Sequence, residues 1–199
     1  MDPQPQLKLS TTQATVLGLL AFGQRSGYDL LRLAEESVGY IWTPSRSQIY
    51  KVLPRLVAAG LATAREVEQQ RRPDKAVYTI TPQGRKTLRA WLAEIEHGSP
   101  NASTLFALKL FFCDFVPPEV ARAQLNAYRA FLIRRLDTYE QMRKDPNDQE
   151  RLFPQMILAR AIARIRATLE WADGVEVAIA QRTRDTPSFA SRAKRTRNA

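Results

Sequence analysis

The chain has 199 residues, of which 44% are apolar, so it can bury a core and form one large domain or two small ones. Its formal charge of +10 favours a polyanionic partner, and nucleic acid is the first candidate. One cysteine and one histidine exclude a disulfide framework and a zinc site built from His and Cys within one chain, and we expect no cofactor. No apolar stretch approaches the roughly 18 residues that span a bilayer, and the N-terminus lacks the pattern of a signal peptide. A cytoplasmic protein without membrane contact is therefore expected.

The positive charge lies at the two ends of the chain. Residues 1–93 carry 13 basic and 7 acidic groups, residues 94–180 carry 11 and 12, and residues 181–199 carry 6 and 1. We therefore expect an anionic partner to bind the N-terminal half of the chain, and the neutral middle to have a different function. Residues 183–199 have no apolar periodicity, which predicts a disordered basic tail.

Two short helices are predicted at the start of the chain. The apolar positions among residues 16–20 have helical spacing, and Ser10, Thr11 or Thr12 can cap a helix that extends to about residue 22. Residues 23–27 break the chain between two glycines, and a second helix begins near residue 28 and stops at residue 39.

A third helix follows, with one apolar face and one polar, basic face. It begins either at Thr43-Pro44, because proline suits the first turn, or at Ser45, because Ser45-x-x-Gln48 is a capping-box pattern. Gly60 is placed to end it in a left-handed cap. Pro54 removes an amide donor inside this helix, so a kink is expected there.

The next segment reads as a β-hairpin and a fourth helix. Residues 62–68 and 76–81 are predicted strands, and the polar residues 69–75 between them form a charged tip. Thr81 and Pro82 are placed to start the helix, which His97-Gly98-Ser99-Pro100 ends. This last stretch is the best candidate for a domain boundary.

The rest of the chain is predicted to form helices over residues 103–114, 118–144 and 149–182. The expected fold class is therefore mainly α with a small β-hairpin. It comprises a winged helix-turn-helix over residues 1–98 and a C-terminal helical dimerisation domain over residues 99–182.

The last helix carries two adjoining apolar stripes. The first comprises Leu158, Ile162, Ile165, Leu169 and Ala172, and the second comprises Ile157, Ala161, Thr168, Trp171, Val175 and Ala178. A helix with two apolar faces needs two neighbours, one from its own chain and one from a second copy. We therefore predict a homodimer, with dimerisation residues Leu158, Ile162, Ile165 and Leu169.

Three helices followed by a hairpin is the order of a winged helix-turn-helix, in which the helix after the turn enters the major groove of DNA. The residues of the third helix expected to bind DNA are Arg46, Ser47, Gln48, Tyr50, Lys51 and Arg55. The basic residues expected to bind DNA from the hairpin are Arg71, Arg72 and Lys75. The alternative is that both surfaces are ordinary solvated faces. The expected kink also leaves the assignment of Arg55 open.

Several motifs resemble the PadR-like transcriptional regulators. They are Thr15-Val16-Leu17-Gly18-Leu19-Leu20, Ser26-Gly27-Tyr28-Asp29-Leu30, Ser47-Gln48-Ile49-Tyr50-Lys51-Val52-Leu53, Arg55-Leu56, Gly60-Leu61, and Val77-Tyr78-Thr79-Ile80-Thr81-Pro82-Gln83-Gly84 with Leu88 and Trp91-Leu92. The later residues Leu108-Lys109-Leu110-Phe111-Phe112 and Leu169-Glu170-Trp171 resemble the long-armed subgroup related to virulence activators.

This resemblance implies a homodimer, clasped through C-terminal helices, that binds a pseudo-palindromic operator in double-stranded DNA. Such regulators usually repress transcription until an effector loosens them. By position, Ser47, Gln48, Tyr50 and Lys51 match the family's recognition helix, and Arg71, Arg72 and Lys75 match its wing. Tyr50 has two open roles, since its hydroxyl can reach a phosphate or its ring can hold the helix in place.

A small aromatic effector is a further expected partner, and Trp91 and Trp171 are the candidates for lining its pocket. The alternative is that both are core residues. A rival interpretation of the whole chain is a winged-helix protein-interaction module without specific DNA binding. An enzyme is not expected, because His97 is the only histidine and no acid-base pair suited to general acid-base catalysis is recognisable in the sequence.

Overall fold

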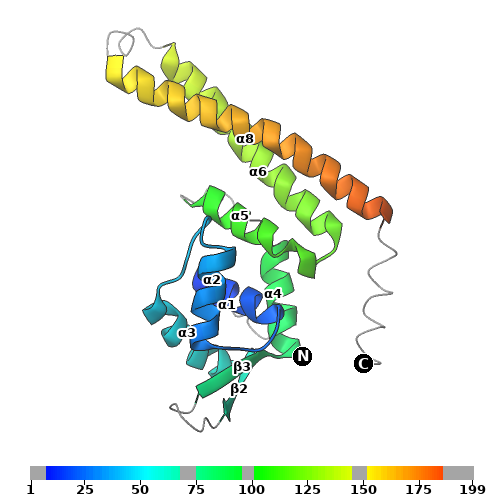
Figure 1. Ribbon diagram of the computed structural model, residues 1–199. Coiled ribbons are helices and arrows are strands. Elements are labelled where there is room, and N and C mark those ends of the chain that lie inside the picture. Colours follow the sequence, from blue (N-terminus) through cyan, green and yellow to red (C-terminus); the bar gives the residue numbers. More distant parts are fainter. Residues whose placement is uncertain (1–7, 68–74, 96–100, 145–151, 186–199) are drawn as a thin grey trace, which may run out of the picture. The chain divides into compact units, whose positions relative to one another are not determined.

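The computed structural model describes residues 8–67, 75–95, 101–144 and 152–185 (Figure 1). The described elements are α1 (Thr11–Ala21), β1 (Arg25–Ser26), α2 (Gly27–Ser37), α3 (Arg46–Ala58), β2 (Ala62–Val67), β3 (Lys75–Ile80), α4 (Pro82–Ala93), α5 (Ala102–Phe111), the 3-10 turn η1 (Cys113–Phe115), α6 (Pro118–Arg143) and α8 (Leu152–Asp185). The predicted fold class, mainly helical with a small antiparallel sheet, is confirmed.

The chain divides into two compact units. The N-terminal unit comprises Met1–Glu94 and Ala107–Val116, and the C-terminal unit comprises Ile95–Phe106 and Pro117–Ala199. This division differs from the predicted boundary at residue 98, because residues 107–116 belong to the N-terminal unit. The reason is packing: Phe112 is fully buried, and its ring is so near Gly18 that a Cβ there would lie 2.5 Å from it.

Three capping boxes fix where the first helices begin. They pair Ser10 with Gln13, Ser26 with Asp29, and Ser45 with Gln48, at the starts of α1, α2 and α3 respectively. In each box the serine hydroxyl accepts a bond from the amide of the third helical residue, and that residue's side chain accepts one from the serine amide. Of the two predicted starts for the third helix, Ser45 is therefore the correct one.

The core of the N-terminal unit forms around α1, whose residues 14–20 are all buried. Helices α2, α3 and α4 and strand β3 contact α1. Helix α3 continues through Pro54 to Ala58, and the predicted cap is present, since Gly60 has a φ of 68° and the Leu61 amide donates to the Leu56 carbonyl at 2.9 Å.

The sheet has three antiparallel strands in the order β1-β3-β2. The predicted hairpin is present, with Ala62 opposite Ile80 and Val67 opposite Lys75. Strand β1 was not predicted, because two residues cannot show an alternating pattern. It pairs with β3 through Arg25 and Ser26 and so places the start of α2 beside the hairpin.

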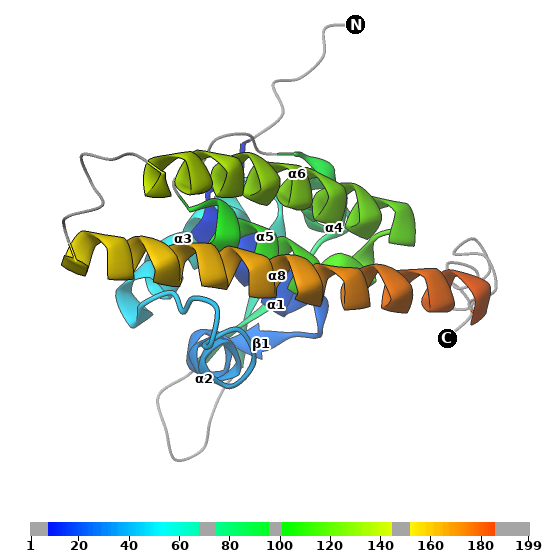
Figure 2. The same cartoon turned by 90° about the horizontal axis from the view of Figure 1, so that it is seen from above.

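The C-terminal unit is built on the hairpin of α6 and α8, which pack side by side (Figures 1 and 2). Ion pairs between the two helices follow their antiparallel register. Arg122 Nε lies 2.9 Å from Glu176 Oε1, Arg166 Nη2 lies 2.6 Å from Glu140 Oε1, and Arg129 pairs with Asp173. Helix α8 extends to Asp185, so residues 183–185 are helical and not part of a tail, and residues 186–199 lie outside the described residues.

The structure changes the assignment of the two stripes on α8. Ile162 and Ile165 are 2% and 7% exposed within the single chain, because this face of α8 packs against α6, whereas Leu158 and Leu169 are partly exposed. The prediction that the first stripe forms the dimer contact therefore needs correction, since the intrachain neighbour already covers its centre.

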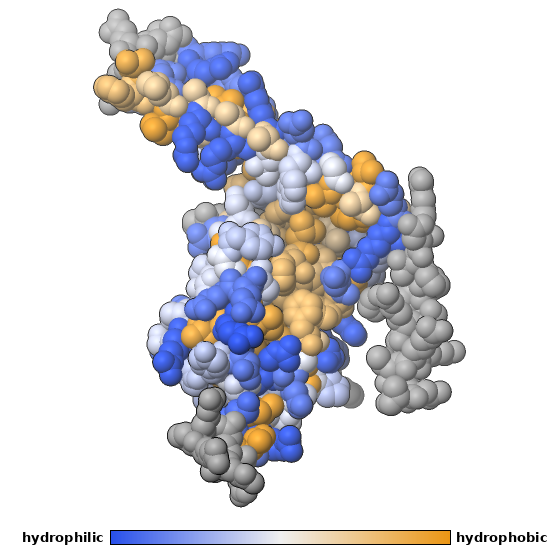
Figure 3. All heavy atoms as spheres, viewed as in Figure 1, coloured by the Kyte–Doolittle hydropathy of each residue, from blue (hydrophilic) through white to orange (hydrophobic). Residues whose placement is uncertain are grey.

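Large apolar side chains remain exposed elsewhere on α8. They are Leu152, Phe153, Met156, Ile157, Trp171 and Val177. Figure 3 shows the resulting apolar surface at the end of the hairpin where α8 begins. Among the described residues, no helix is long and apolar enough to cross a membrane.

Candidate nucleic-acid interface

Helix α3 presents a continuous polar face. The residues predicted to bind DNA from this helix are all exposed: Arg46, Ser47, Gln48, Tyr50, Lys51 and Arg55. On the opposite face Ile49, Leu53 and Leu56 are fully buried, so the helix cannot rotate about its axis without losing its core contacts. The sequence pattern and the packing thus agree on which face is outward.

Gln48 takes part in the cap of α3, whereas its position in the sequence allowed either a cap or a contact with DNA. Its Oε1 accepts a bond of 2.8 Å from the Ser45 amide, so the acceptor end of the side chain is used within the helix cap. A two-bond contact to adenine needs both the carbonyl and the amino group of a glutamine. While the cap is intact, the Gln48 side chain is held at the start of α3 with one lone pair of Oε1 in use, and its amino group can donate to a base or a phosphate.

Tyr50 is both packed and accessible. Tyr50 is 45% exposed, and the guanidinium carbon of Arg46 lies 5.6 Å from the centroid of its ring. On the inner side the ring lies against Gly27, where an added Cβ would be 2.9 Å from Cε1. The geometry is compatible with both roles left open for Tyr50, since the ring packs against Gly27 while the residue stays 45% exposed.

We expect Gly27→Ala to weaken DNA binding more than it weakens folding. The new methyl group would push the Tyr50 ring outward, and a side chain can move at less cost than a backbone. We expect a loss of operator affinity of about 3- to 30-fold with about 1 kcal/mol of destabilisation or less. Titration by fluorescence anisotropy, with urea unfolding of the same variant, tests this. Equal affinities for the variant and the parent would show that the position of Tyr50 does not matter.

The predicted hairpin residues are only partly described. Lys75 opens β3, and its Nζ lies 4.0 Å from Asp29 Oδ2, at the start of α2. This ammonium group is therefore placed at the tip end of the described hairpin, opposite Val67, where a carboxylate partly balances its charge. Arg71 and Arg72 lie outside the described residues, and their role stays a prediction.

Asp29 is held in its ionised form. The Ser26 hydroxyl, which donates to Asp29 Oδ2 at 2.7 Å, is the main cause of a lowered pKa. Burial opposes this shift, and the Ser26 amide, Lys75 and Arg25 lower the pKa further by smaller amounts. The stabilisation from this carboxylate is therefore present above its ordinary pKa of 3.8 and is lost as the pH falls through the lowered value.

We expect Asp29→Asn to be less stable than the parent at neutral pH by on the order of 1 kcal/mol, the usual contribution of a helix cap. The difference should shrink between about pH 5 and pH 3, because the parent then loses the same charge. Urea unfolding at a series of pH values measures it. Glu35→Gln, on the same helix but outside the capping box, is the control, and a difference that does not change with pH would contradict the assignment.

The two tryptophans predicted to line an effector pocket have different surroundings. Trp91 is almost fully buried in the N-terminal unit, whereas Trp171 is 49% exposed in the C-terminal unit, where its ring meets Phe106 edge to face. Neither lines the cavity that the structure shows between α6 and α8.

Lys109 is a buried cation that the sequence did not predict. Lys109 is 1% exposed, donates to the Glu94 carbonyl at the end of α4, and places its ammonium 4.9 Å from the centroid of the Trp91 ring. A lysine within an apolar run carries no signal of burial, so this link between α5 and α4 could not be predicted. Tyr28, exposed next to the contact of Gly27 with Tyr50, was likewise given no role.

Within the described part of the chain, no group of three His, Cys, Asp or Glu side chains could hold a metal ion. Burial raises the pKa of Cys113 to about 11, with a smaller contribution from Asp114, so the thiol stays protonated at neutral pH. The arrangement of the N-terminal unit suits contacts to an anionic surface.

Comparison with known proteins agrees with this arrangement. The profile of the transcriptional regulator PadR-like family matches residues 16–90, and that of the virulence activator alpha C-terminal region matches residues 105–180. A probable transcriptional regulator of Mycobacterium tuberculosis is 32% identical over 172 residues, which cover 79% of this chain and 91% of the relative.

Two further matches come from Bacillus subtilis. The negative transcriptional regulator PadR is 27% identical over 168 residues, which cover 80% of this chain and 92% of the relative. The crystal structure of B. subtilis PadR in complex with operator DNA matches with a TM-score of 0.45 at 24% identity, over 85% of this chain and 99% of that one. The chain belongs to the PadR-like family of transcriptional regulators.

Proposed function

We propose that this regulator is a homodimeric, sequence-specific DNA-binding repressor that a small molecule releases. The observation that carries the proposal is the outward face of α3, where six polar or basic side chains are exposed while the helix is fixed by its cap and its buried face. A pre-formed polar helix of this kind fits the major groove without reorganisation.

The exposed residues divide by the contacts they can make. Arg46 and Lys51 carry the charges that can bind phosphates or the acceptor atoms of guanine. Ser47 shares a hydrogen bond of 3.0 Å with Ser45 and presents its hydroxyl beside them. Phosphate contacts would supply much of the affinity, so binding should weaken steeply as the salt concentration rises.

The rival interpretation, a protein-interaction module without DNA binding, is disfavoured by the same face. No acidic residue lies on the exposed side of α3, which is described over its whole length. An acidic residue there would repel phosphates, and its absence leaves the face suited to a polyanion.

The dimer is supported by the apolar surface of α8. Ile157 and Trp171 belong to the second predicted stripe, and both remain exposed in the single chain, as do Phe153 and Met156. Burying such side chains against a second copy is favourable by about 25 cal/mol per Å² of apolar surface. Two recognition helices could then enter successive major grooves about 34 Å apart. A monomer by light scattering at micromolar concentration would contradict this part of the proposal.

The direction of regulation is proposed from the sequence relative in B. subtilis, whose name describes a negative regulator. Release by a small molecule is proposed because the C-terminal unit has a cavity between its two long helices. A ligand changes operator affinity only if it binds the free and the DNA-bound forms with different affinity.

The test is a titration of the full chain against the DNA upstream of its own gene, with a random duplex as competitor and at two salt concentrations. We expect tight binding that survives the competitor and weakens with salt. Equal, weak binding to both duplexes would overturn sequence-specific recognition and favour the protein-interaction module.

A further inference from the structure

The first turn of α2 lies between α3 and the β-hairpin. On one side, Gly27 packs on the Tyr50 ring of α3, where an added Cβ would lie 2.9 Å from Cε1. On the other side, strand β1 pairs with β3, and Asp29 Oδ2 lies 4.0 Å from Lys75 Nζ. Residues 25–29 therefore connect the two elements that are predicted to bind DNA.

Tyr28 points outward from the middle of this turn. Successive residues of an α-helix are rotated by about 100° about its axis. Because Gly27 faces α3 and Asp29 faces the hairpin, Tyr28 lies between these two directions. It lies nearly opposite Leu30, which is fully buried. Tyr28 is 63% exposed, and its hydroxyl has no hydrogen-bond partner among the residues that the structure describes.

The charges around Tyr28 leave room for an anion. Asp29 is the acidic residue of this turn, and its Oδ2 accepts from the Ser26 hydroxyl at 2.7 Å and faces the Lys75 ammonium. Arg25 lies three residues before Tyr28, with its Nη1 donating to the Gln24 carbonyl at 2.9 Å. The two cations offset the single carboxylate, so the surface around Tyr28 does not repel a phosphate.

The same turn lies where a DNA strand has to pass. In B-form DNA, one sugar-phosphate strand separates the major groove from the adjacent minor groove. The proposed function places α3 in the major groove, and the basic hairpin is predicted to reach the adjacent minor groove. The strand between the grooves must then cross the space between α3 and the hairpin. Tyr28 faces this space, and tyrosine hydroxyls are among the groups that bind phosphate oxygens.

We propose that Tyr28 is a further DNA-binding residue, whose hydroxyl donates a hydrogen bond to the phosphate strand between the two grooves. The inference rests on the proposed function, because it requires α3 and the hairpin to bind DNA together. Phosphate contacts fix the orientation of a protein on the duplex and carry no sequence information. Tyr28 therefore positions α3 in the groove, and α3 itself contacts the bases.

The test is an anisotropy titration of full-chain Tyr28→Phe, which lacks only the hydroxyl, against the operator and a random duplex. We expect both affinities to fall by a similar factor, roughly 5- to 50-fold, because each half-site loses one hydrogen bond to a phosphate. The slope of log affinity against log salt should stay the same, because the lost group is neutral.

Tyr40→Phe is the matched control, because it removes the same hydroxyl from the other end of α2. Tyr40 is 81% exposed, and α2 extends over roughly 16 Å between the two tyrosines. We expect this variant to bind within about 2-fold of the parent. Urea unfolding should give the same midpoint for both variants, since each removes an exposed hydroxyl. Equal losses of affinity in the two variants would overturn the proposal.

A second measurement identifies the phosphate. Operator duplexes are prepared in which single phosphates are replaced in turn by neutral methylphosphonates. One replacement, between the bases that α3 contacts and the minor groove, should weaken binding by the parent and have much less effect on Tyr28→Phe, whose hydroxyl is already absent. Equal weakening of the parent and the variant at every position would contradict the contact.

These outcomes separate the inference from the proposed function. If the parent binds the operator tightly and Tyr28→Phe binds it equally, the proposed function stands and the Tyr28 contact is wrong. If the parent binds all duplexes equally and Tyr28→Phe weakens that binding, sequence-specific recognition is wrong and the Tyr28 contact stands. A parent chain that binds neither duplex would overturn both.

Discussion

Replacing Arg46 and Lys51 together by alanine is expected to weaken operator binding about 100-fold. Both side chains are exposed on the outward face of α3, and each charged contact to a phosphate or a guanine contributes about 1 to 3 kcal/mol. The slope of log affinity against log salt should fall by about 2 if both bind phosphates. Anisotropy titrations at several salt concentrations measure both quantities.

The control removes the same charge from a distant surface. Arg134 and Arg160 are exposed on α6 and α8, and replacing both by alanine leaves the N-terminal unit unchanged. We expect this variant to bind operator within about 3-fold of the parent, since net charge alone acts weakly across a screening length of about 8 to 10 Å. Equal losses in the two double variants would mean that α3 makes no specific contact.

Replacing Gly84 by alanine is expected to cost at least about 3 kcal/mol of stability in the N-terminal unit. An added Cβ would lie 2.0 Å from the Leu61 carbonyl oxygen and 2.9 Å from Ile80 Cγ1. That carbonyl accepts a hydrogen bond of 3.0 Å from the Thr81 amide. It therefore cannot move away without breaking the bond between the residue before β2 and the residue before α4. Urea unfolding should show a lower midpoint.

Gly174→Ala provides the matched control for this prediction. Gly174 lies within α8, where an added Cβ would meet nothing within 4 Å, and alanine favours the helix over glycine by up to about 1 kcal/mol. We therefore expect the same substitution to destabilise the chain at residue 84 and to stabilise it slightly at residue 174. A fully stable Gly84→Ala variant would refute the close packing of Gly84 on the Leu61 carbonyl.

Local signals in the sequence were enough to place the helices of the N-terminal unit. The serine caps, the glycine after α3 and the Thr81-Pro82 start of α4 act through their immediate neighbours, so their structure follows from spacing alone. The outward face of α3 could be predicted for the same reason, since a helical period assigns each residue to one side.

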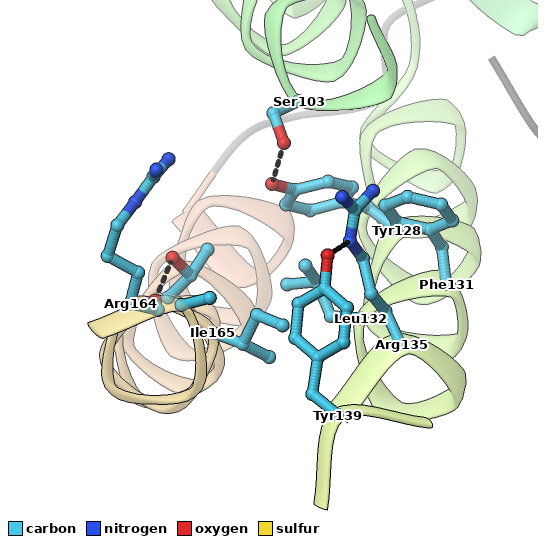
Figure 4. A pocket seen from close by; sticks show the side chains of 10 residues that line it. Ser103, Tyr128, Phe131, Leu132, Arg135, Tyr139, Arg164 and Ile165 are labelled. Atoms are coloured by element: carbon cyan, nitrogen blue, oxygen red, sulfur yellow. Dashed lines mark hydrogen bonds between the residues drawn. The ribbon is translucent and has the colours of Figure 1, made fainter. Parts of the chain in front are cut away.

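Features that depend on distant neighbours could not be predicted. The stripes on α8 are both apolar, and only the packing against α6 decides which is covered within the chain, so Ile162 and Ile165 were assigned to the wrong contact. Gln48 fits both a cap and a base contact, and only the folded structure shows that its side chain takes part in the cap. The cavity between α6 and α8 (Figure 4) is lined by residues from both helices and from α5, and no spacing in the sequence reveals that these residues lie near one another.

In the proposed homodimer, two copies of α3 bind DNA as a symmetric pair. The most direct measurement is selection of binding sites by the purified full chain from a pool of random duplexes, followed by sequencing of the bound fraction. We expect an inverted repeat whose half-sites are centred about 10 base pairs apart, and its enrichment should be lost when Arg46 and Lys51 are both alanine. Recovery of no motif, or of the same motif by that double variant, would contradict it.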